Sequence, residues 1–347
     1  IFMLFGAFFG IFEESIALLP ILILLSLSMG WDTLTGMGMC LLAAGFGFAT
    51  AITNPFSIGI ASSLANTNIL SGFLYRFIIF IIMYGLLQFF LVHHAKKIEK
   101  DPTLSLTYDS DQNKVKDFSS EEKLPEEHGK YVLKVYVMLF VILLLGIVLT
   151  GVLELAFGIS LPAIPLMAVI FLIGGITAGY LVTKKMKYTL KTFLSGMAGV
   201  APAFVLIVLA VSVKHIISEA QVMDTILYYL ANILEGRSPI IGILFIYVLV
   251  LLIQFFIGSA SAKAFLIMPL ILPLVGLIGI SKELAILAFV FGDGYTNVIF
   301  PTNGVLLIGL SIASVSYGKW FKFTYKLQLS VLALTVIFLI IGIWIGY

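Results

Sequence analysis

Long apolar runs follow one another along the whole of this chain, and short polar or turn segments separate them. A helix needs about 20 apolar residues to cross the hydrocarbon core of a bilayer, and most of these runs approach that length. Glu13 and Glu14 interrupt the first run, and Gly258-Ser259-Ala260-Ser261 separates two later ones. The pattern predicts an all-α membrane protein with apolar segments at residues 1–29, 35–65, 69–92, 135–157, 161–183, 194–213, 239–257, 262–278, 284–315 and 324–347.

One extended polar stretch, residues 93–134, divides the chain into two apolar parts. We predict that residues 1–92 form an N-terminal repeat with a hairpin, a broken helix and a span. We predict that residues 135–347 form a C-terminal repeat with three spans, an amphipathic stretch at 220–235, a hairpin, a broken helix and a last span. The polar stretch is expected to be a cytoplasmic loop between the two repeats.

A polar Thr-Asn pair occurs twice inside apolar runs, at Thr53-Asn54 and at Thr302-Asn303. The two pairs are separated by 303 − 54 = 249 positions. The same offset maps Pro20 onto Pro269, Gly30 onto Gly279 and Gly45 onto Gly294. The shared offset predicts two copies of one membrane-embedded unit. It also predicts roughly 120 further N-terminal residues with about three spans, because the second copy contains that much chain ahead of the part that matches Ile1.

Lysine clusters predict the orientation of the spans, because short cytoplasmic loops carry an excess of Lys and Arg. The clusters lie at residues 184–191 and 319–326. With the loop 93–134 also in the cytoplasm, the number of crossings places both clusters on that same side. The first copy then starts from the cytoplasm and the second from the outside. We therefore predict an inverted repeat, the arrangement common in secondary transporters.

Composition supports this fold class and argues against others. Hydrophobic residues make up 61% of the chain and charged residues 11%, whereas charged residues make up about 25% of a soluble domain. The single cysteine, Cys40, excludes an intrachain disulfide, and the lack of a nucleotide-binding loop argues against a primary pump. An intramembrane aspartyl protease needs two membrane aspartates, and Asp293 is the only aspartate deep in a span. We therefore do not expect an enzyme of this kind, and no other enzyme is expected. A channel is not expected, because the polar residues cluster at mid-depth instead of lining a continuous pore.

Each Thr-Asn pair lies beside residues that break a helix. Pro55 follows the first pair, while Pro301 and Gly304 flank the second. Proline removes a backbone N–H and frees a carbonyl one turn earlier, so both helices should unwind near mid-membrane. Freed carbonyls and the Thr and Asn side chains offer oxygens for Na⁺ near Asn54 and Asn303, and half-helix N-termini suit a carboxylate. The alternative is a kinked helix in which these side chains bond only to their neighbours.

The small, uncharged connection at residues 258–261 predicts a re-entrant hairpin, since it lacks the charges of a water-exposed loop. The offset maps it onto the segment Gly10–Glu14, which we predict to be a second hairpin tip. The offset pairs Glu14 with Lys263, so one tip would present a carboxylate and the other an ammonium. Such a cavity suits an amino acid, and Glu13 would favour a cationic side chain. The alternatives are a water-facing interface for the glutamates and an internal salt bridge for Lys263.

The remaining polar residues in or beside the spans also have a functional or a structural interpretation. Asp293, between two glycines, could coordinate a cation, carry a coupling proton, or serve as a structural partner for a backbone amide or a lysine. Asn297 lies six residues before Asn303 and could face the same break. Arg76 is expected to snorkel outward from the start of its span. Asp32 and Trp31 are expected to form an interfacial turn.

The C-terminal motifs resemble those of a known family. The segments are Gly258-Ser259-Ala260-Ser261-Ala262-Lys263-Ala264, Phe291-Gly292-Asp293-Gly294-Tyr295-Thr296-Asn297, Pro301-Thr302-Asn303-Gly304 and Tyr317-Gly318-Lys319-Trp320. They look like those of the YfcC-like family of basic amino acid antiporters, grouped with the anaerobic C4-dicarboxylate carriers in the ion transporter superfamily. The resemblance implies a homodimer in which two hairpins and two broken helices move as an elevator against a scaffold. Distant relatives carry Ser-Asn-Thr motifs at these tips and breaks, where this chain has Ile-Thr-Asn-Pro and Pro-Thr-Asn-Gly.

Together these observations predict a secondary transporter of small organic solutes, with an amino acid as the expected substrate and a C4-dicarboxylate or other carboxylate as the alternative. No cofactor is expected beyond Na⁺ or H⁺ as coupling ion. The expected partners are the small-molecule substrate, the lipid bilayer of a bacterial cytoplasmic (inner) membrane and a second copy of the chain, but no nucleic acid. The candidate binding residues are Glu13, Glu14, Thr53, Asn54, Ser259, Ser261, Lys263, Asp293, Asn297, Thr302 and Asn303.

Overall fold

The computed structural model describes residues 1–119, 129–139, 141–142, 145–146, 163–195, 197, 212, 229, 232 and 237–347. Within these residues every regular element is a helix, which confirms the all-α fold. Five helices in the described part of the chain are long and apolar enough to span a membrane: Thr33–Ala65, Phe73–Lys100, Pro239–Phe256, Ala260–Leu277 and Tyr317–Trp344. Most of the predicted spans 135–157 and 194–213, and of the amphipathic stretch 220–235, lies outside the described residues.

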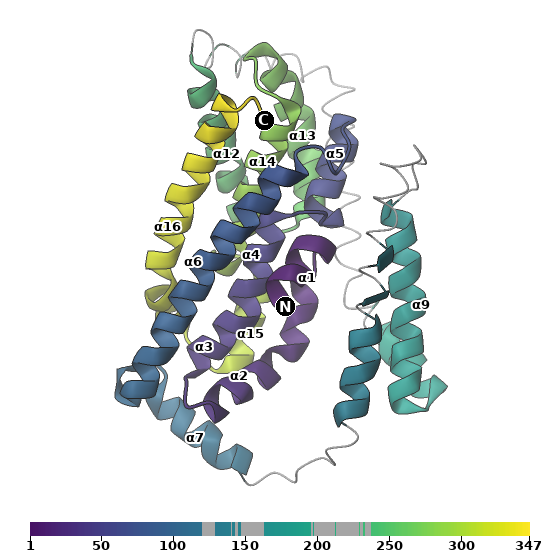
Figure 1. The fold of residues 1–347 in the computed structure, drawn as a ribbon, viewed down its shortest axis with the longest axis vertical. Coiled ribbons are helices and arrows are strands. Elements are labelled where there is room, and N and C mark those ends of the chain that lie inside the picture. Colours follow the sequence, from purple (N-terminus) through teal and green to yellow (C-terminus); the bar gives the residue numbers. More distant parts are fainter. Residues whose placement is uncertain are drawn as a thin grey trace. The chain divides into compact units, whose positions relative to one another are not determined.

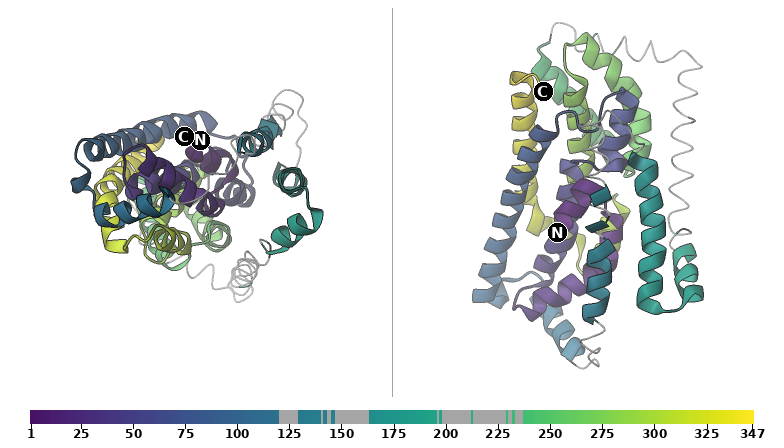
Figure 2. Two further views of the ribbon diagram at one scale, coloured as in Figure 1. Left: turned by 90° about the horizontal axis from the view of Figure 1, so that it is seen from below. Right: turned by 45° about the vertical axis from the view of Figure 1, so that its right-hand side comes forward.

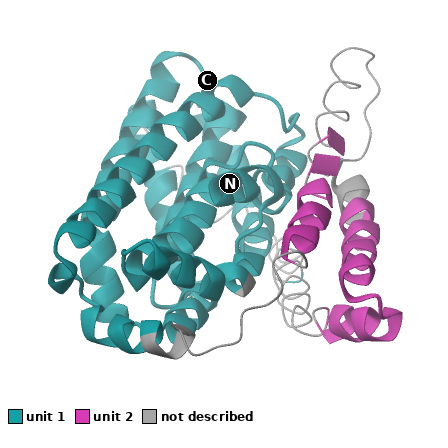
Figure 3. Ribbon diagram, turned by 60° about the horizontal axis from the view of Figure 1, so that its bottom comes forward, with its two compact units in different colours: residues 1–120, 207–347 teal, residues 121–206 magenta. Residues whose placement is uncertain are grey.

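The chain divides into two compact units, Ile1–Ser120 with Ile207–Tyr347, and Glu121–Leu206 (Figure 3). The second unit contains α9 (Ala163–Thr183) and helices over residues 129–139 and 186–195. The first unit contains every candidate binding residue. The boundaries that the polar stretch suggests, at residues 92 and 134, stay predictions.

The first unit begins with a helical hairpin made of α1 (Phe2–Phe9), the 3₁₀ turn η1 (Glu13–Leu18) and α2 (Leu19–Ser28). Helix α1 ends at Gly10, whose φ of 70° is the left-handed conformation that glycine adopts without strain. α1 packs closely on α4 (Ala43–Thr50), because a methyl group on Gly6 or Gly47 would overlap the backbone of the other helix.

The first broken helix follows this hairpin. Helix α3 (Thr33–Met37), the π-helical turn η2 (Gly38–Leu42) and α4 are continuous and end at Ala51, where φ is 37°. A second helical segment, η3 (Pro55–Gly59) and α5 (Ile60–Ala65), then begins at Pro55. Proline suits the first helical position because its missing N–H would have no partner there. The predicted break at the first Thr-Asn pair is confirmed.

The second hairpin and the second broken helix repeat this order. The hairpin consists of α12 (Pro239–Phe256) and α13 (Ala260–Leu277). Helix α14 (Lys282–Gly294) continues into the 3₁₀ turn η5 (Tyr295–Val298), and the chain unwinds before α15 (Gly304–Ala313). Each copy ends in a long helix, α6 (Phe73–Lys100) and α16 (Tyr317–Trp344), and these two helices lie side by side (Figures 1 and 2).

The two copies share their turns and helix caps at the offset of 249. Asp32 caps the N-terminus of α3 and Ser281 caps that of α14, and 281 − 32 = 249. Gly30 and Gly279, the residues two positions before these caps, both have positive φ, at 78° and 69°. The sequence repeat is therefore a structural repeat.

Contacts at both ends show that the broken helices are antiparallel. At one end, Lys282 Nζ donates a hydrogen bond of 2.9 Å to the carbonyl of Ala65, so α14 begins where α5 ends. At the other end, Lys114 Nζ donates to Ala313 O at 2.6 Å and to Thr33 Oγ1 at 2.9 Å, so α15 ends where α3 begins. The predicted inverted repeat is confirmed.

The two broken helices cross at glycines that the offset relates to each other. A methyl group on Gly45 would overlap Val298 Cγ1, and one on Gly294 would overlap the Cα and Cβ of Ala49. At the same crossing the rings of Phe46 and Tyr295 pack edge to face, with 5.3 Å between centroids. Small residues let two helix backbones approach closely in a membrane, which explains why glycine occupies both positions.

Asp32 forms a buried polar cluster at the end of the unit where α3 begins. Its side chain accepts hydrogen bonds from Thr35 N at 2.8 Å and from Ser105 Oγ at 2.7 Å, and it lies 3.0 Å from His94 Nε2. Asp111, in α7 (Tyr108–Ser119), accepts from the backbone N and the hydroxyl of Thr33. The expected interfacial turn at Asp32 is thus an anchor that holds the segment 101–119 against the unit.

This cluster predicts a loss of stability in acid. Burial raises the pKa of Asp32, but the hydrogen bonds from His94, Thr35 and Ser105 outweigh burial and lower the pKa below its ordinary 3.8. A lowered carboxyl pKa contributes stability that is present above the ordinary value and is lost as the pH falls through the folded-state value. Asp32→Asn should lower the free energy of unfolding at neutral pH by about 1.5–3 kcal/mol, the range for hydrogen bonds to a charged group.

The matched control for this prediction is Asp101→Asn, because Asp101 also caps a short helix, η4 (Pro102–Leu104), but bonds Thr103 at an exposed position. Thermal unfolding in detergent, measured at pH 7 and below pH 4, should show an acid-sensitive component that Asp32→Asn removes and Asp101→Asn keeps. Equal acid sensitivity in the wild type and in Asp32→Asn would show that Asp32 is not its source.

Arg76 contradicts the expectation that it snorkels outward. Its side chain is 2% exposed and donates hydrogen bonds to the carbonyls of Ile69 and Ser71. Its guanidinium also bonds Ile52 O at 3.4 Å and Tyr347 Oη at 3.2 Å. Residues 66–72 form turns whose backbone carbonyls include some without a hydrogen-bond donor from a helix. The five N–H groups of the guanidinium can donate to several such carbonyls at once. Arg76 is therefore a structural residue that ties the first break to the loop beyond it.

Candidate functional site

The first break is held by Thr53 and Asn54. Thr53 donates from its backbone N to Ala7 O at 3.1 Å and from its hydroxyl to Phe8 O at 3.0 Å. These carbonyls belong to the last turn of α1, where a helix leaves carbonyls without partners. Asn54 is fully buried, and its Oδ1 accepts from Phe56 N at 2.9 Å as the N-cap of the second segment. The first hairpin and the first break are thus joined by the Thr-Asn pair.

The second break contains a chain of three buried amides. Asn303 caps α15 by accepting from Leu306 N at 3.0 Å, and its Nδ2 donates to Asn297 Oδ1 at 2.9 Å. Gln254 Nε2, from the end of α12, donates to the same oxygen at 2.6 Å. Gln254 is 2% exposed, and its own carbonyl oxygen is one of the described buried atoms with no hydrogen-bond partner. Sequence reasoning missed Gln254, because the offset maps it onto Phe5 and no motif marks it.

Two aromatic side chains occupy the carbonyls that the second break frees. Trp320 Nε1 donates to Val298 O and Tyr317 Oη donates to Ile299 O, both at 2.7 Å. These donors belong to the Tyr-Gly-Lys-Trp motif at the start of α16. The carbonyls of Val298 and Ile299 are therefore held by protein donors. The Na⁺ near Asn303 stays a prediction, and Gln254 Oε1 is one unpartnered amide oxygen beside that position.

The tip of the second hairpin contacts both breaks. Ser261 Oγ donates to Phe56 O, two residues after Asn54, at 3.3 Å. A methyl group on Gly258 would lie 4.0 Å from Asn303 Nδ2. Ser259 caps α13 by accepting from Ala262 N at 3.4 Å. Because the tip lies beside the interruptions of two helices, it lies between the ends of the unit, as a re-entrant hairpin requires.

The tip of the first hairpin also approaches the first break. Gly10 is so close to Asn54 Oδ1 and to the ring of Phe56 that a methyl group there would overlap both. The exposed Glu13 and Glu14 begin η1, which packs against η2 and α15. The turn that carries the two glutamates therefore lies between the first broken helix and the second segment of the other one.

Lys263 and Asp293 form an ion pair with 2.7 Å between Nζ and Oδ1, and both side chains are 0% exposed. Of the interpretations weighed for these residues, the internal salt bridge describes the geometry. The ammonium of Lys263 is enclosed, so it does not face Glu14 across an open cavity in this structure. Asp293 likewise faces the lysine and not the solvent.

The structure brings most of the candidates to the tips and breaks. Thr53, Asn54, Asn297 and Asn303 are buried there, Ser261 touches the first break, and Thr302 is exposed beside the second. Within the described residues no group of three or more His, Cys, Asp or Glu side chains could hold a metal ion. The chemistry of the site is therefore that of amide and hydroxyl groups, with two carboxylates at one edge.

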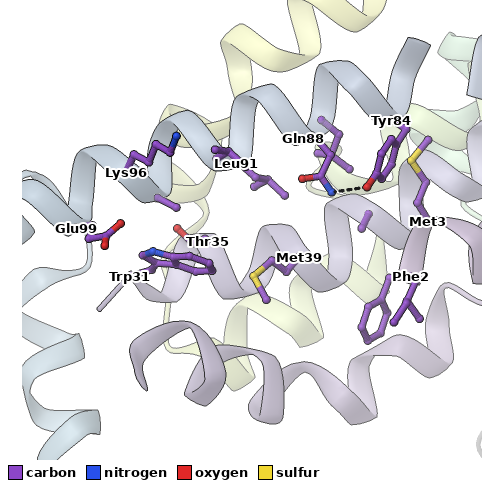
Figure 4. A pocket seen from close by; sticks show the side chains of 15 residues that line it. Phe2, Met3, Trp31, Thr35, Met39, Tyr84, Gln88, Leu91, Lys96 and Glu99 are labelled. Carbon is purple, nitrogen blue, oxygen red and sulfur yellow. Dashed lines mark hydrogen bonds between the residues drawn. The ribbon is translucent and has the colours of Figure 1, made fainter. Parts of the chain in front are cut away.

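Two of the cavities elsewhere in the first unit lie beside the broken helices. One, of about 270 Å³, lies between α1, the first broken helix and α6, with Lys96, Glu99 and Trp31 at one end and the bonded pair Tyr84 and Gln88 further along (Figure 4). The other, of about 340 Å³, lies beside the second break and includes Tyr295, Thr296, Ile299 and Gln328 in its lining. None of the candidate binding residues lines either cavity.

Comparison with known proteins agrees with this architecture. A protein of Escherichia coli K12 named "Putative basic amino acid antiporter YfcC" is 28% identical over 333 residues, which are 93% of this chain and 64% of that protein. An uncharacterized protein of Haemophilus influenzae is 27% identical over 343 residues, 97% of this chain and 65% of that protein. The chain thus spans less than two thirds of the length of these relatives.

A solved structure and a family model complete the comparison. The crystal structure of the Alcanivorax borkumensis YdaH transporter, whose topology is described as unusual, matches with a TM-score of 0.70 at 19% identity, over 100% of this chain and 78% of that one. At this identity the likeness shows a shared fold. The family model for DcuC, described as C4-dicarboxylate anaerobic carrier, matches residues 1–344. The chain is therefore an integral membrane protein that belongs to the C4-dicarboxylate anaerobic carrier family of transporters.

Proposed function

We propose that this protein is a secondary active transporter that moves small organic solutes, namely amino acids, across the membrane by alternating access. The observation that carries the proposal is the meeting of two antiparallel helix breaks, capped by Asn54 and Asn303, at the tip of one hairpin. Broken helices in inverted repeats bind substrates where half-helix N-termini and unwound backbone come together. The proposed substrate site consists of Thr53, Asn54, Ser259, Ser261, Asn297, Thr302 and Asn303, with Glu13 and Glu14 at its edge.

The charges around the site favour an amino acid with a cationic side chain. The N-terminus of a half-helix carries a partial positive charge that attracts a carboxylate, and Asn54 and Asn303 each begin such a segment. The exposed Glu13 and Glu14 offer negative charge at the first tip. The name of the Escherichia coli relative, a basic amino acid antiporter, agrees with this proposal.

A C4-dicarboxylate is the second candidate substrate. The family description favours it, and two half-helix N-termini could each receive one carboxylate. Against it stand Glu13 and Glu14, since like charges would repel a dianion.

The proposed transport cycle moves the first unit, which contains both hairpins and both broken helices, against the rest of the protein. The buried amides and the ion pair would then cross the membrane within a packed body and would not be exposed to lipid. We propose that the protein works as a homodimer in a bacterial cytoplasmic membrane, with H⁺ or Na⁺ as coupling ion.

Uptake into proteoliposomes tests this proposal. The complete protein should take up radiolabelled arginine in a saturable manner, and ornithine should compete while succinate should not. The same assay with and without Na⁺ reports the coupling ion. Competition by succinate alone would favour the dicarboxylate carrier, and uptake that does not saturate for any probe would contradict a carrier.

A further inference from the structure

The buried ion pair joins two elements of the unit that the proposed cycle moves. Lys263 lies in the first turn of α13, directly after the tip of the second hairpin, and Asp293 lies one residue before the end of α14. Their charged atoms are 2.7 Å apart. Ser261, two residues before the lysine, touches the first break, and Asn297, four residues after the aspartate, belongs to the second. The pair therefore fixes the hairpin tip to the helix that carries the second break.

Among the described residues, the elements packed around the pair bring no other buried countercharge. Among the described elements packed against α13 and α14, the elements α4, α5 and η3 carry no titratable residue, α12 brings Tyr247, and η5 brings Tyr295. Lys282 and Glu283 begin α14, roughly 15 Å from Asp293 along the helix. The remaining titratable groups belong to α16: Tyr317 and Tyr325, which are partly buried, and Lys319, Lys322 and Lys326, which are exposed, whereas the ion pair is enclosed. Lys263 and Asp293 are thus each other's charged neighbour.

Stability does not explain this arrangement. Neither Lys263 Nζ nor the Asp293 oxygens have a further hydrogen-bond partner among the described residues. A buried pair without additional hydrogen bonds gains little over well-packed apolar side chains, whereas removal of one charge leaves the other uncompensated. Ionisable residues inside a membrane usually mark a path for ions or protons.

We propose that Lys263 and Asp293 form a proton-operated latch, so that binding of one proton to Asp293 releases the hairpin tip and couples proton movement to transport. The inference rests on the proposed carrier function and names its coupling ion. A proton from water on the open side adds to a carboxylate oxygen of Asp293 and forms an O–H bond. The Lys263 ammonium then has no countercharge, and the tip moves until water solvates it. Loss of the proton on the opposite side restores the carboxylate and the pair.

A double variant in which both members of the pair are uncharged, called the neutral pair, separates proton coupling from substrate exchange. Lys263→Gln with Asp293→Asn removes both charges together, so no single buried charge is left to prevent folding. The complete protein is reconstituted and given radiolabelled arginine or succinate, in counterflow without a pH gradient and in accumulation driven by a gradient. For one proton per substrate, about one pH unit drives about tenfold accumulation in the wild type. A pH-sensitive dye inside the vesicles reports the proton. The matched control is Glu283→Gln, which removes the other carboxylate of α14.

The proposal predicts that the neutral pair still exchanges substrate in counterflow but neither accumulates it nor moves protons, while Glu283→Gln does both. Gradient-driven accumulation by the neutral pair would overturn the latch, as would the loss of counterflow in a variant that still elutes as a folded protein. A wild type that exchanges substrate without moving protons would overturn it as well. A wild type without counterflow for either probe would instead contradict the proposed carrier function.

Discussion

Replacement of Asn303 or Asn54 by alanine is expected to abolish uptake while the protein still inserts into the membrane. Asn303 caps α15 and donates to Asn297, and Asn54 caps the segment that begins at Pro55. Loss of a cap costs about 0.5–2 kcal/mol, which is too little to prevent insertion of so apolar a chain. Loss of hydrogen bonds to a charged substrate, about 1.5–3 kcal/mol each, lowers uptake by about ten- to hundredfold per site even before the geometry of the break is disturbed.

The matched control is Asn113→Ala, because Asn113 is exposed on α7. Initial uptake rates in proteoliposomes, normalised to the amount of inserted protein, compare the three variants. Normal uptake by both Asn54→Ala and Asn303→Ala would show that the breaks do not bind the substrate. Equal loss in Asn113→Ala would show that the assay reports insertion or handling instead.

Replacement of Gly294 by alanine is expected to disrupt the fold of the first unit. The added methyl group would overlap the Cα and Cβ of Ala49, and backbone atoms cannot rotate away as a flexible side chain can. Overpacking in a tight core costs about 1–3 kcal/mol and more where the backbone is in the way. We expect a lower melting temperature in detergent, a broader elution profile and little uptake.

Gly85→Ala is the control for this substitution, because Gly85 lies inside α6 and a methyl group there would meet nothing within 4 Å. Alanine inside a helix is favoured over glycine by about 0.5–1 kcal/mol, so this variant should be as stable as the wild type or slightly more stable. If Gly294→Ala had the same melting temperature as Gly85→Ala, the two broken helices could not cross as closely as the structure shows.

The sequence repeat, together with the lysine clusters, was sufficient to predict the two hairpins and the two antiparallel broken helices. Local backbone features recur at a fixed offset: Gly30 and Gly279 adopt the same left-handed conformation, and Asn54 and Asn303 both cap the segment after a break. Each of these depends on local chemistry, namely the conformational freedom of glycine, the missing N–H of proline and the capping oxygen of asparagine. Such features can be predicted from residues a few positions apart.

The partners of the polar side chains could not be predicted in the same way. Lys263 meets Asp293 and Gln254 meets Asn297 only through the packing of separate helices, which no spacing in one segment reveals. Arg76 looked like an interfacial residue by its place at the start of a span, yet the turn at residues 66–72 supplies carbonyls that bury it. The sequence therefore predicts which residues gather at the breaks better than it predicts the contacts that each residue makes.

Alternating access through the two breaks can be measured directly. Thr302, exposed beside the second break, is replaced by cysteine in a chain whose single buried Cys40 is serine. A membrane-impermeant maleimide is then applied to right-side-out and to inverted vesicles, with and without arginine or succinate. Under alternating access the cysteine should react from both sides, and a transported substrate should change the ratio of the two rates. Reaction from one side only, whatever substrate is present, would contradict it.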